Sequence, residues 1–506
     1  MKYKIFIAII ILNISCQKFL YDEDDKIGII ENENELEEAM LGIYGLLGNV
    51  FHNYDILAAF VLADDINIEA DHVVPGYGEC DFEIPVSSVE NNISIIGSKI
   101  YQDFYKTIIS ANNLIKQKDQ IQRFSQANSC IGEAYFIRSI CYFYLTRLFG
   151  EIPIITDIEV KYDVYLSNIP DVYSFIEADM LEAMQLLPLS NQLARIPYST
   201  PHKGTVKAIL AEIYLNMAGY PLKDIEKYEL AAKYAGEVID SSEFYGMGLE
   251  NDLAKVWDID YFDNPEKIIG IVLDEIPVEP NEPGNWSSME DYYEKVQRRI
   301  KPEYNFYINY PNNYRKKVSF YYGYNYGLIT IDDEDYEYKR LAEPRDMGYC
   351  DFMYTINYRK WLVNGEYNIV AIYLYRYAHT LLTYAEAKAR SGQLDASAYE
   401  AVNKIRRRAN KIDINQSSGF DLQEGLNPEQ FADSVIQERA LEFCAEPEGR
   451  WFDILRLEKL EEIHNKRYDY EPEVPWYSNI PEENYYLDLP QEDIWLNPNL
   501  SDTLDQ

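Results

Sequence analysis

Positive charge is scarce in this sequence. Of its 506 residues, 46 are Lys or Arg and 85 are Asp or Glu, so the formal net charge is −39. Such a chain repels a nucleic-acid backbone or an anionic membrane surface over most of its own surface. Nucleic acid is therefore the first class of partner to be excluded.

Histidine is also scarce, and recognisable catalytic motifs are missing. The five histidines are scattered, and no Gly-x-Ser-x-Gly, His-Glu-x-x-His, Walker or dinucleotide-binding motif occurs. Abundant carboxylates do not indicate hydrolysis, because some pair falls at glycosidase distance by chance. The acidic run at 332–335 lacks EF-hand spacing and is interpreted as a solvated loop rather than a calcium site. We therefore predict no catalytic residue, metal site or cofactor, and we expect His379 to be packed or half-exposed rather than catalytic.

Cysteine usage gives no sign of a disulfide framework. Five cysteines follow Cys16, an odd number, and none has Cys-x-x-Cys spacing. Cys130 and Cys141 fall on apolar helical positions, so we expect them to be small buried residues.

Long hydrophobic runs are absent from the N-terminus. Lys2 and Lys4 precede an apolar stretch of eight residues, 5–12, which is typical of a signal peptide and too short for a membrane span. Ser15 and Cys16 at its end resemble the lipobox of bacterial lipoproteins. The alternative is a plain secretory signal with a chance cysteine.

The lipobox resemblance implies that residues 1–15 are removed and that Cys16 is the lipid-attachment site. We expect residues 16–32 to form a flexible acidic tether. Its acidic run, 22–25, is similar to the sorting signal of some surface lipoproteins, although a solvated tether has the same composition.

The stretch GEAYFIRSICYFYLTRLFGEIPI, residues 132–154, has the apolar periodicity of a helix that stops at Gly150. Buried charges cost several kcal/mol each when unpaired. We therefore interpret Glu133, Arg138 and Arg147 as paired groups that link helices. The alternative is a ligand groove along this helix.

Amphipathic patterns of helical period recur along the chain. They cover residues 33–48, 94–118, 171–187, 204–219, 227–240, 373–391, 397–411 and 428–446. Paired segments with Ala and Tyr at close-packing positions resemble tetratricopeptide helix pairs of degenerate period. Gly, Pro, Asn and aromatic residues dominate 64–92 and 245–370, which we expect to be loop-rich.

Longer motifs carry a resemblance to the SusD/RagB family. The stretch 132–154, "RYAHTLLTYAEAKARSG", "AVNKIRRRAN", "QERALEFCAEPEGRWFDILR" and "LPQEDIWLNPNL" are similar to its signatures. Matching positions include Glu133, Arg138, Arg147, Gly150, Arg376, Glu386, Asn403, Arg408, Glu438, Arg439, Glu442, Glu446, Arg450, Asp453, Arg456, Pro490 and Asn497. One extra residue stands near Pro447 relative to the usual Glu-Gly-x-Arg spacing.

The resemblance implies one mainly α-helical SusD-like domain, residues 33–506, built from tetratricopeptide-like helix pairs with a long irregular insertion. The helical scaffold is expected at about 33–244 and 371–460, the ligand-facing insertion at 245–370, and a C-terminal segment at 461–506.

The resemblance also implies a function. Family members are non-catalytic outer-membrane lipoproteins that capture nutrients for a SusC-like, TonB-dependent transporter. The starch-utilisation branch implies an oligosaccharide ligand at the cell surface, and the RagB branch implies an oligopeptide. A protein that only covers its transporter is the third possibility.

Tyrosine is abundant, with 46 residues, and its ring suits both core packing and sugar stacking. Sugars present flat C–H faces ringed by hydroxyls, which suit a stacked aromatic ring beside hydrogen-bonding side chains. The two loop-rich regions contain aromatic residues, so we expect the site there. The predicted ligand-binding residues are Tyr77, Trp286, Tyr304, Tyr307, Tyr310, Tyr324 and Tyr326.

Overall fold

The fold is known from a computed structural model. It describes residues 28–52, 63–68, 86–158, 163–190, 200–257, 264–273, 300–302, 304–324, 327–329, 355–358, 370–463 and 485–501.

Helices make up most of the described chain, as the sequence predicts. They are α2 (Glu33–His52), α4 (Val86–Lys116), α5 (Lys118–Ile121), α6 (Ala127–Phe149), α7 (Ile169–Leu186), α8 (Lys203–Met217), α9 (Lys227–Asp240), α10 (Ser242–Tyr245), α11 (Leu253–Val256), α13 (Tyr304–Asn309), α14 (Tyr314–Ser319), α16 (Tyr377–Arg390), α17 (Ala396–Ala409), α18 (Pro428–Glu442), α19 (Arg450–Arg456), α21 (Gln491–Leu496) and the 3-10 turn η7 (Pro498–Leu500).

Short strands form three small antiparallel sheets. The strands are β1 (Ile66–Ile68), β2 (Lys267–Leu273), β3 (Ile300–Pro302), β4 (Phe320–Tyr324), β5 (Gly327–Ile329), β6 (Thr355–Tyr358) and β7 (Val370–Arg376). β1 pairs with β3, β2 pairs with β7, and β4 lies between β5 and β6.

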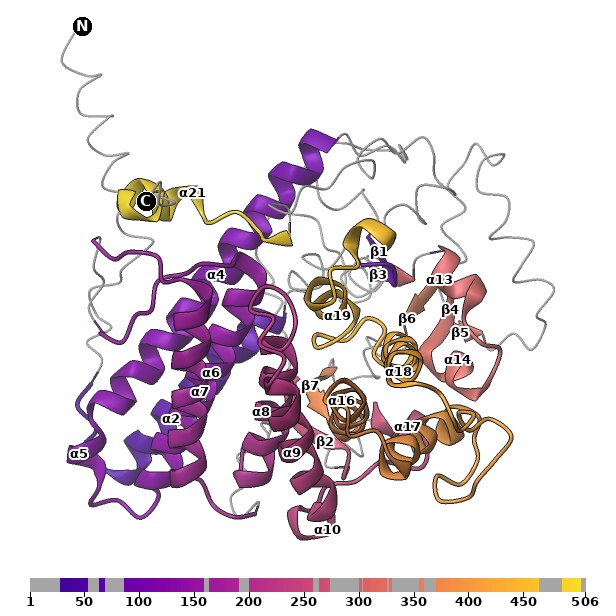
Figure 1. Cartoon of the computed structure of the whole chain (residues 1–506). Coiled ribbons are helices and arrows are strands. Elements are labelled where there is room, and N and C mark those ends of the chain that lie inside the picture. Colours follow the sequence, from indigo (N-terminus) through magenta and orange to yellow (C-terminus); the bar gives the residue numbers. More distant parts are fainter. Residues whose placement is uncertain are drawn as a thin grey trace, which may run out of the picture.

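Helices that follow one another in the sequence pack side by side. α4 contacts α6, α6 contacts α7, α8 contacts α9, and α16 contacts both α17 and α18. α9 also packs against α16, which joins the N-terminal helices to the later ones across the sequence gap between them. In Figure 1 these helices form the body of the molecule, and α13, α14 and β4–β6 lie on one side of it, next to α18.

Local sequence signals set the ends of these helices. Asn427 caps α18: its side chain accepts a hydrogen bond from the backbone N–H of Gln430, and the side-chain oxygen of Gln430 accepts one from the backbone N–H of Asn427. Pro428 occupies the first turn, where its missing N–H costs nothing. α18 ends at Glu442, because a turn begins there, so the expected helix to residue 446 is too long.

The charged residues of α6 link helices, as predicted. Glu133 accepts a hydrogen bond of 2.9 Å from the Tyr44 hydroxyl of α2. Arg138 donates to both oxygens of Asp179 in α7, at 2.7 and 2.8 Å. All four side chains are buried. The ligand-groove alternative is therefore wrong for this part of α6, because the charges face other helices.

Arg147, near the end of α6, reaches a residue far away in sequence. Its guanidinium forms a two-pronged ion pair with Glu448. The same group lies between the rings of Phe143 and Phe452, at 3.5 and 3.7 Å from their centroids. A buried cation between two aromatic faces and a carboxylate is fully compensated. Arg147 therefore fixes the region after α18 to the N-terminal helices.

Other segment boundaries also differ from the sequence prediction. α4 begins at Val86, within the range 64–92 that was expected to be loop-rich. Residues 373–376 end strand β7 instead of beginning a helix, because they pair with β2. The N-terminal tether was expected to extend to residue 32, but Ile30 is buried and its N–H donates to Gln117 at 2.9 Å. The packed domain therefore includes residues before Glu33.

The C-terminal segment is attached to the helical body. The N–H of Leu487 donates to the carbonyl of Leu148 at 2.7 Å, and the Asn497 side chain donates to the carbonyl of Val164 at 2.8 Å. Leu500 is buried. The asparagine of the closing motif is thus a structural link.

The cysteines in the described residues are buried. Cys130 and Cys141 are fully buried, as predicted, and Cys444 is buried and unbridged as well.

None of the helices in the described ranges is both long and apolar enough to cross a bilayer.

Candidate ligand-binding face

β1 and β3 join the two loop-rich regions of the sequence. Ile66 pairs with Pro302 and Ile68 pairs with Ile300, so the two strands are antiparallel. Because of this direction, the chain that follows Ile68 and the chain that precedes Ile300 leave the strand pair at the same end. We call this pair the β1–β3 ribbon. It brings together the attachment points of the segments that contain Tyr77 and Trp286.

Two of the predicted sugar-stacking residues are core residues instead. Tyr307 and Tyr310 are 6% and 2% exposed, and each ring packs edge-on against Phe320 with centroids 5.1 Å apart. The Tyr310 hydroxyl donates to the carbonyl of Leu441 at 2.7 Å, and Lys316 lies over the Tyr307 ring. Both assignments are corrected, because a ring enclosed on these sides has no face left for a sugar.

The other predicted positions are not tested by these contacts. Tyr304 begins α13 and Tyr324 ends β4, but their side chains lie outside the described part of the structure. Tyr77, Trp286, Tyr326 and the predicted lipid-attachment residue Cys16 all lie outside the described residues as well.

Arg315 of α14 ties the insertion to the scaffold. Its Nη1 donates to Glu438 at 2.6 Å and to Glu442 at 2.9 Å, both on α18. All three side chains are buried. Burial alone would lower the pKa of Arg315, but the charge of Glu438, with Tyr310 and Glu442, raises it far above its ordinary value. The cation is therefore permanent, and it holds α14 against α18.

The scaffold side of this contact is an alternating network of buried charges. Glu266 accepts hydrogen bonds from Arg376 and Arg408. Arg408 also pairs with Glu442 at 2.7 Å, and Arg376 pairs with Glu446 at 2.9 Å. Each of these carboxylates faces an arginine, so the network holds helices together and offers no free acid or base.

His379 is packed, one of the two positions that the sequence predicts. Its ring stacks between Phe443, at 3.6 Å and 5°, and Tyr375, at 4.7 Å and 27°. Burial and the nearby charges of Arg376 and Arg439 hold its pKa well below the ordinary value. The imidazole is thus neutral, and it accepts from the N–H of Arg376 through Nδ1.

Sequence reasoning did not foresee how the ribbon is held. Asp64 and Asp65 directly precede β1, and they contact Arg450 and Ala445 at the turn between α18 and α19. Burial, with a smaller contribution from the charge of Asp64, raises the pKa of Asp65 to about 7. The available signal was an acidic pair before a short apolar run, but no pattern connected it to residues so far away.

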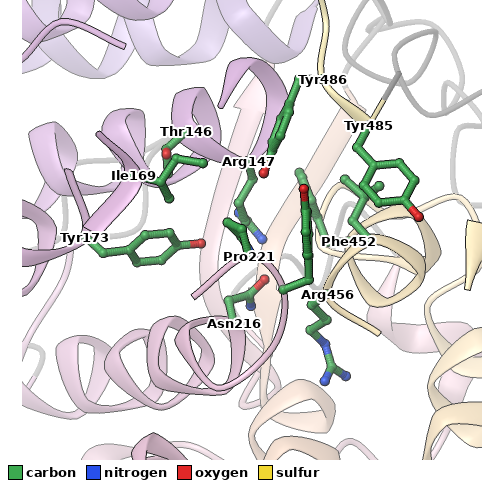
Figure 2. Close-up of a pocket in the computed structure, with 12 residues that line it drawn as sticks. Thr146, Arg147, Ile169, Tyr173, Asn216, Pro221, Phe452, Arg456, Tyr485 and Tyr486 are labelled. Atoms are coloured by element: carbon green, nitrogen blue, oxygen red, sulfur yellow. The ribbon is translucent and has the colours of Figure 1, made fainter. Parts of the chain in front are cut away.

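An aromatic pocket lies elsewhere, where α6, α7 and α19 meet the C-terminal segment. Figure 2 shows the Tyr173 hydroxyl pointing into it, with Tyr485 and Tyr486 at its rim. Its space, open mouth included, is about 350 Å³, but its interior has room for only about one water molecule. Arg147 and Arg456 at its wall are already paired with carboxylates. The pocket is therefore too small for a sugar ring.

In the part of the chain that the structure describes, no group of three or more His, Cys, Asp and Glu side chains has the arrangement of a metal site.

Comparison with known proteins places this architecture in a family. A family model described as "SusD family" matches residues 282–504, and a second, described as "Starch-binding associating with outer membrane", matches residues 87–215. Together they match much of the helical body and the part of the insertion from residue 282 onward. The chain belongs to the SusD/RagB family.

Individual relatives extend the match over nearly the whole chain. A SusD-like protein, P2, of Formosa agariphila is 26% identical over 495 residues, which span 91% of this chain and 92% of that protein. The crystal structure of a SusD homolog from Bacteroides thetaiotaomicron has a TM-score of 0.72 at 22% identity, covering 96% of this chain and 99% of that one. A laminarin-binding SusD-like protein has a TM-score of 0.67 at 19% identity, covering 92% and 98%.

Proposed function

We propose that this protein is a non-catalytic, cell-surface lipoprotein of the outer membrane. It binds oligosaccharides and delivers them to a SusC-like, TonB-dependent transporter. Membership of the SusD/RagB family supports the class, and the lipobox at Cys16 supports the anchor. The laminarin-binding relative and the starch-binding description of one matching family model support a carbohydrate ligand.

The antiparallel β1–β3 ribbon is the observation that carries the proposal for the site. It brings the attachment points of two aromatic-rich segments together at one end of a single strand pair. Stacked rings supply affinity for sugar faces, and ring pairs on separate loops suit an extended chain of sugars. We assign recognition to Tyr77 and Trp286, which belong to these two segments, and, from the sequence prediction, to Tyr304, Tyr324 and Tyr326.

The charge network supports a binding role without catalysis. In the described residues, buried carboxylates of the insertion and of the adjoining scaffold, such as Glu266 and Glu442, are paired with arginines. General acid–base hydrolysis requires two carboxyl groups that face the scissile bond. These groups serve the scaffold instead.

Calorimetry with laminarin, starch fragments and a panel of other oligosaccharides tests the site. Trp286→Ala is expected to weaken binding about tenfold to hundredfold, because a stacked ring contributes roughly 1–3 kcal/mol by analogy with base stacking. Its melting temperature is expected to stay close to that of the wild type.

Tyr310→Phe is the matched control. It removes the hydroxyl that donates to Leu441, so it is expected to lower stability and leave affinity unchanged. If all five aromatic-to-alanine variants bind as the wild type does, the site lies elsewhere. Binding of oligopeptides without binding of any glycan would replace the carbohydrate ligand by the RagB-type alternative.

A further inference from the structure

Two consecutive residues at the base of the β1–β3 ribbon contact one turn of the scaffold. Arg450 donates to both oxygens of Asp64, from Nε at 2.6 Å and from Nη2 at 3.0 Å. The N–H of Ala445 donates to Asp65 at 2.9 Å. We call these four residues the ribbon anchor. The ribbon therefore meets the α18–α19 turn through a two-pronged ion pair and a hydrogen bond from the backbone.

The α18–α19 turn is itself held on two sides. Glu446 pairs with Arg376 at the end of β7, and Glu448 pairs with Arg147 of α6. Ala445 has φ of 55°, a conformation that residues with a side chain seldom adopt. Such a backbone persists only where the surroundings determine it. The turn is thus a fixed support, and its N–H at Ala445 points at the ribbon.

This turn lies where the spacing of the chain differs from that of the family it resembles. The turn contains Pro447, near which one extra residue separates this chain from the usual family spacing. The extra residue lies between the two anchor positions, Ala445 and Arg450. The spacing of the two groups that meet Asp64 and Asp65 therefore depends on it.

The ribbon needs such support because it is small. Each strand has three residues, and an isolated two-stranded ribbon is marginally stable at best in water. Asp65 is 1% exposed, and the Arg450 side chain is 12% exposed. Both groups are thus shielded from solvent next to the N-terminal end of β1, in a position to hold it.

We propose that Asp64, Asp65 and Arg450 are positioning residues for ligand recognition. They hold the β1–β3 ribbon against the α18–α19 turn and so fix the attachment points of the two aromatic segments. The role in recognition rests on the function proposed above, whereas the anchoring of the ribbon is independent of it.

Hydrogen exchange of the purified full-length protein tests the anchoring. Asp64→Ala is expected to speed exchange in segments 63–68 and 300–302 roughly tenfold to hundredfold, the range for loss of a hydrogen bond to a charged group. Arg450→Met is expected to act alike, and Arg450→Lys to recover part of the protection, because it keeps the charge and loses the fork. Unchanged exchange in 300–302 would overturn the anchor.

The control variant removes an exposed ion pair elsewhere. Lys223 pairs with Glu458 at 2.8 Å on the surface, so Lys223→Met is expected to leave exchange in both ribbon segments unchanged. Asp64 is about one-third exposed, so Asp64→Ala is expected to fold even where Arg450→Met does not.

Laminarin calorimetry on the same variants tests the positioning role. Asp64→Ala is expected to weaken binding about tenfold, while Lys223→Met binds as the wild type does. If the wild type binds laminarin and Asp64→Ala binds it equally well, the positioning role is wrong and the proposed function is unaffected. A wild type that binds none of the glycans in the panel overturns the proposed function, and the exchange measurements then decide the anchor alone.

Discussion

Replacing Arg138 by Met is expected to strand a buried carboxylate. Arg138 forms two hydrogen bonds to Asp179 and a third, of 2.7 Å, to Asn112. Asp179 is 4% exposed. Removing one partner of a buried ion pair costs about 3–5 kcal/mol, because the remaining charge has neither water nor a counter-ion.

That cost converts into a measurable change in melting temperature. Unfolding entropy is about 2.1 cal/mol/K per residue, so a domain of nearly 500 residues that unfolds as a unit has about 1 kcal/mol/K. A loss of 3–5 kcal/mol then lowers the melting temperature by about 3–5 °C. Differential scanning calorimetry of wild type and Arg138→Met at pH 7.5 measures this shift.

The pH dependence of the stability loss in Arg138→Met shows how much of that loss comes from the unpaired charge of Asp179 and how much from lost packing. Burial already raises the pKa of Asp179, and the hydrogen bonds and charge of Arg138 lower it again. Without Arg138 the pKa is expected to rise further, so Asp179 can take up a proton in the folded variant as the pH falls. The difference between wild type and Arg138→Met is therefore expected to be smaller at pH 5 than at pH 7.5.

A double variant and a surface control complete this test. Arg138→Met with Asp179→Leu is expected to recover most of the lost stability, because both charges are then absent. Lys106→Met removes a pair with Asp103 in which the lysine is 57% exposed, and it is expected to change the melting temperature by less than about 1 °C. A double variant as unstable as Arg138→Met would refute the reasoning, since the loss would then come from packing.

Two further predictions concern the anchor in the membrane and the base of the ribbon. Cys16→Ala is expected to release the protein from the membrane fraction. Membrane-bound protein without an acyl label would contradict the lipoprotein assignment. A large β-barrel protein that co-purifies with the wild type would support the transporter partner. Asp65→Asn keeps an acceptor for the N–H of Ala445 and removes the ionisable group. Because the pKa of Asp65 is about 7 in the folded protein and about 4 in an unfolded chain, its contribution to stability falls as the pH rises between these values. The melting temperature of Asp65→Asn relative to that of the wild type is therefore expected to rise from pH 4 to pH 7 and then level off. A constant difference across that range would show that Asp65 does not titrate there.

The sequence alone determined the helical scaffold and the structural role of its charges. Helical periodicity located α6, α8, α9, α17 and most of the other long helices, because apolar residues at steps of three and four must face a core. The cost of unpaired buried charge identified Glu133, Arg138 and Arg147 as helix-linking groups without any coordinates. Their partners were not predictable, since Glu448 is far from Arg147 in sequence.

Tertiary structure decided which aromatic residues are buried and how the loop-rich regions meet. Tyrosine suits a core and a sugar platform equally well, so composition did not separate Tyr307 and Tyr310 from their neighbours; only the contacts with Phe320 and Leu441 did. Strand pairing between β1 and β3 depends on register across a long sequence gap, and three-residue strands carry too little periodic pattern to reveal it. The support beneath that ribbon is likewise a property of the folded chain, because Asp64 and Arg450 meet only after the helices between them have packed.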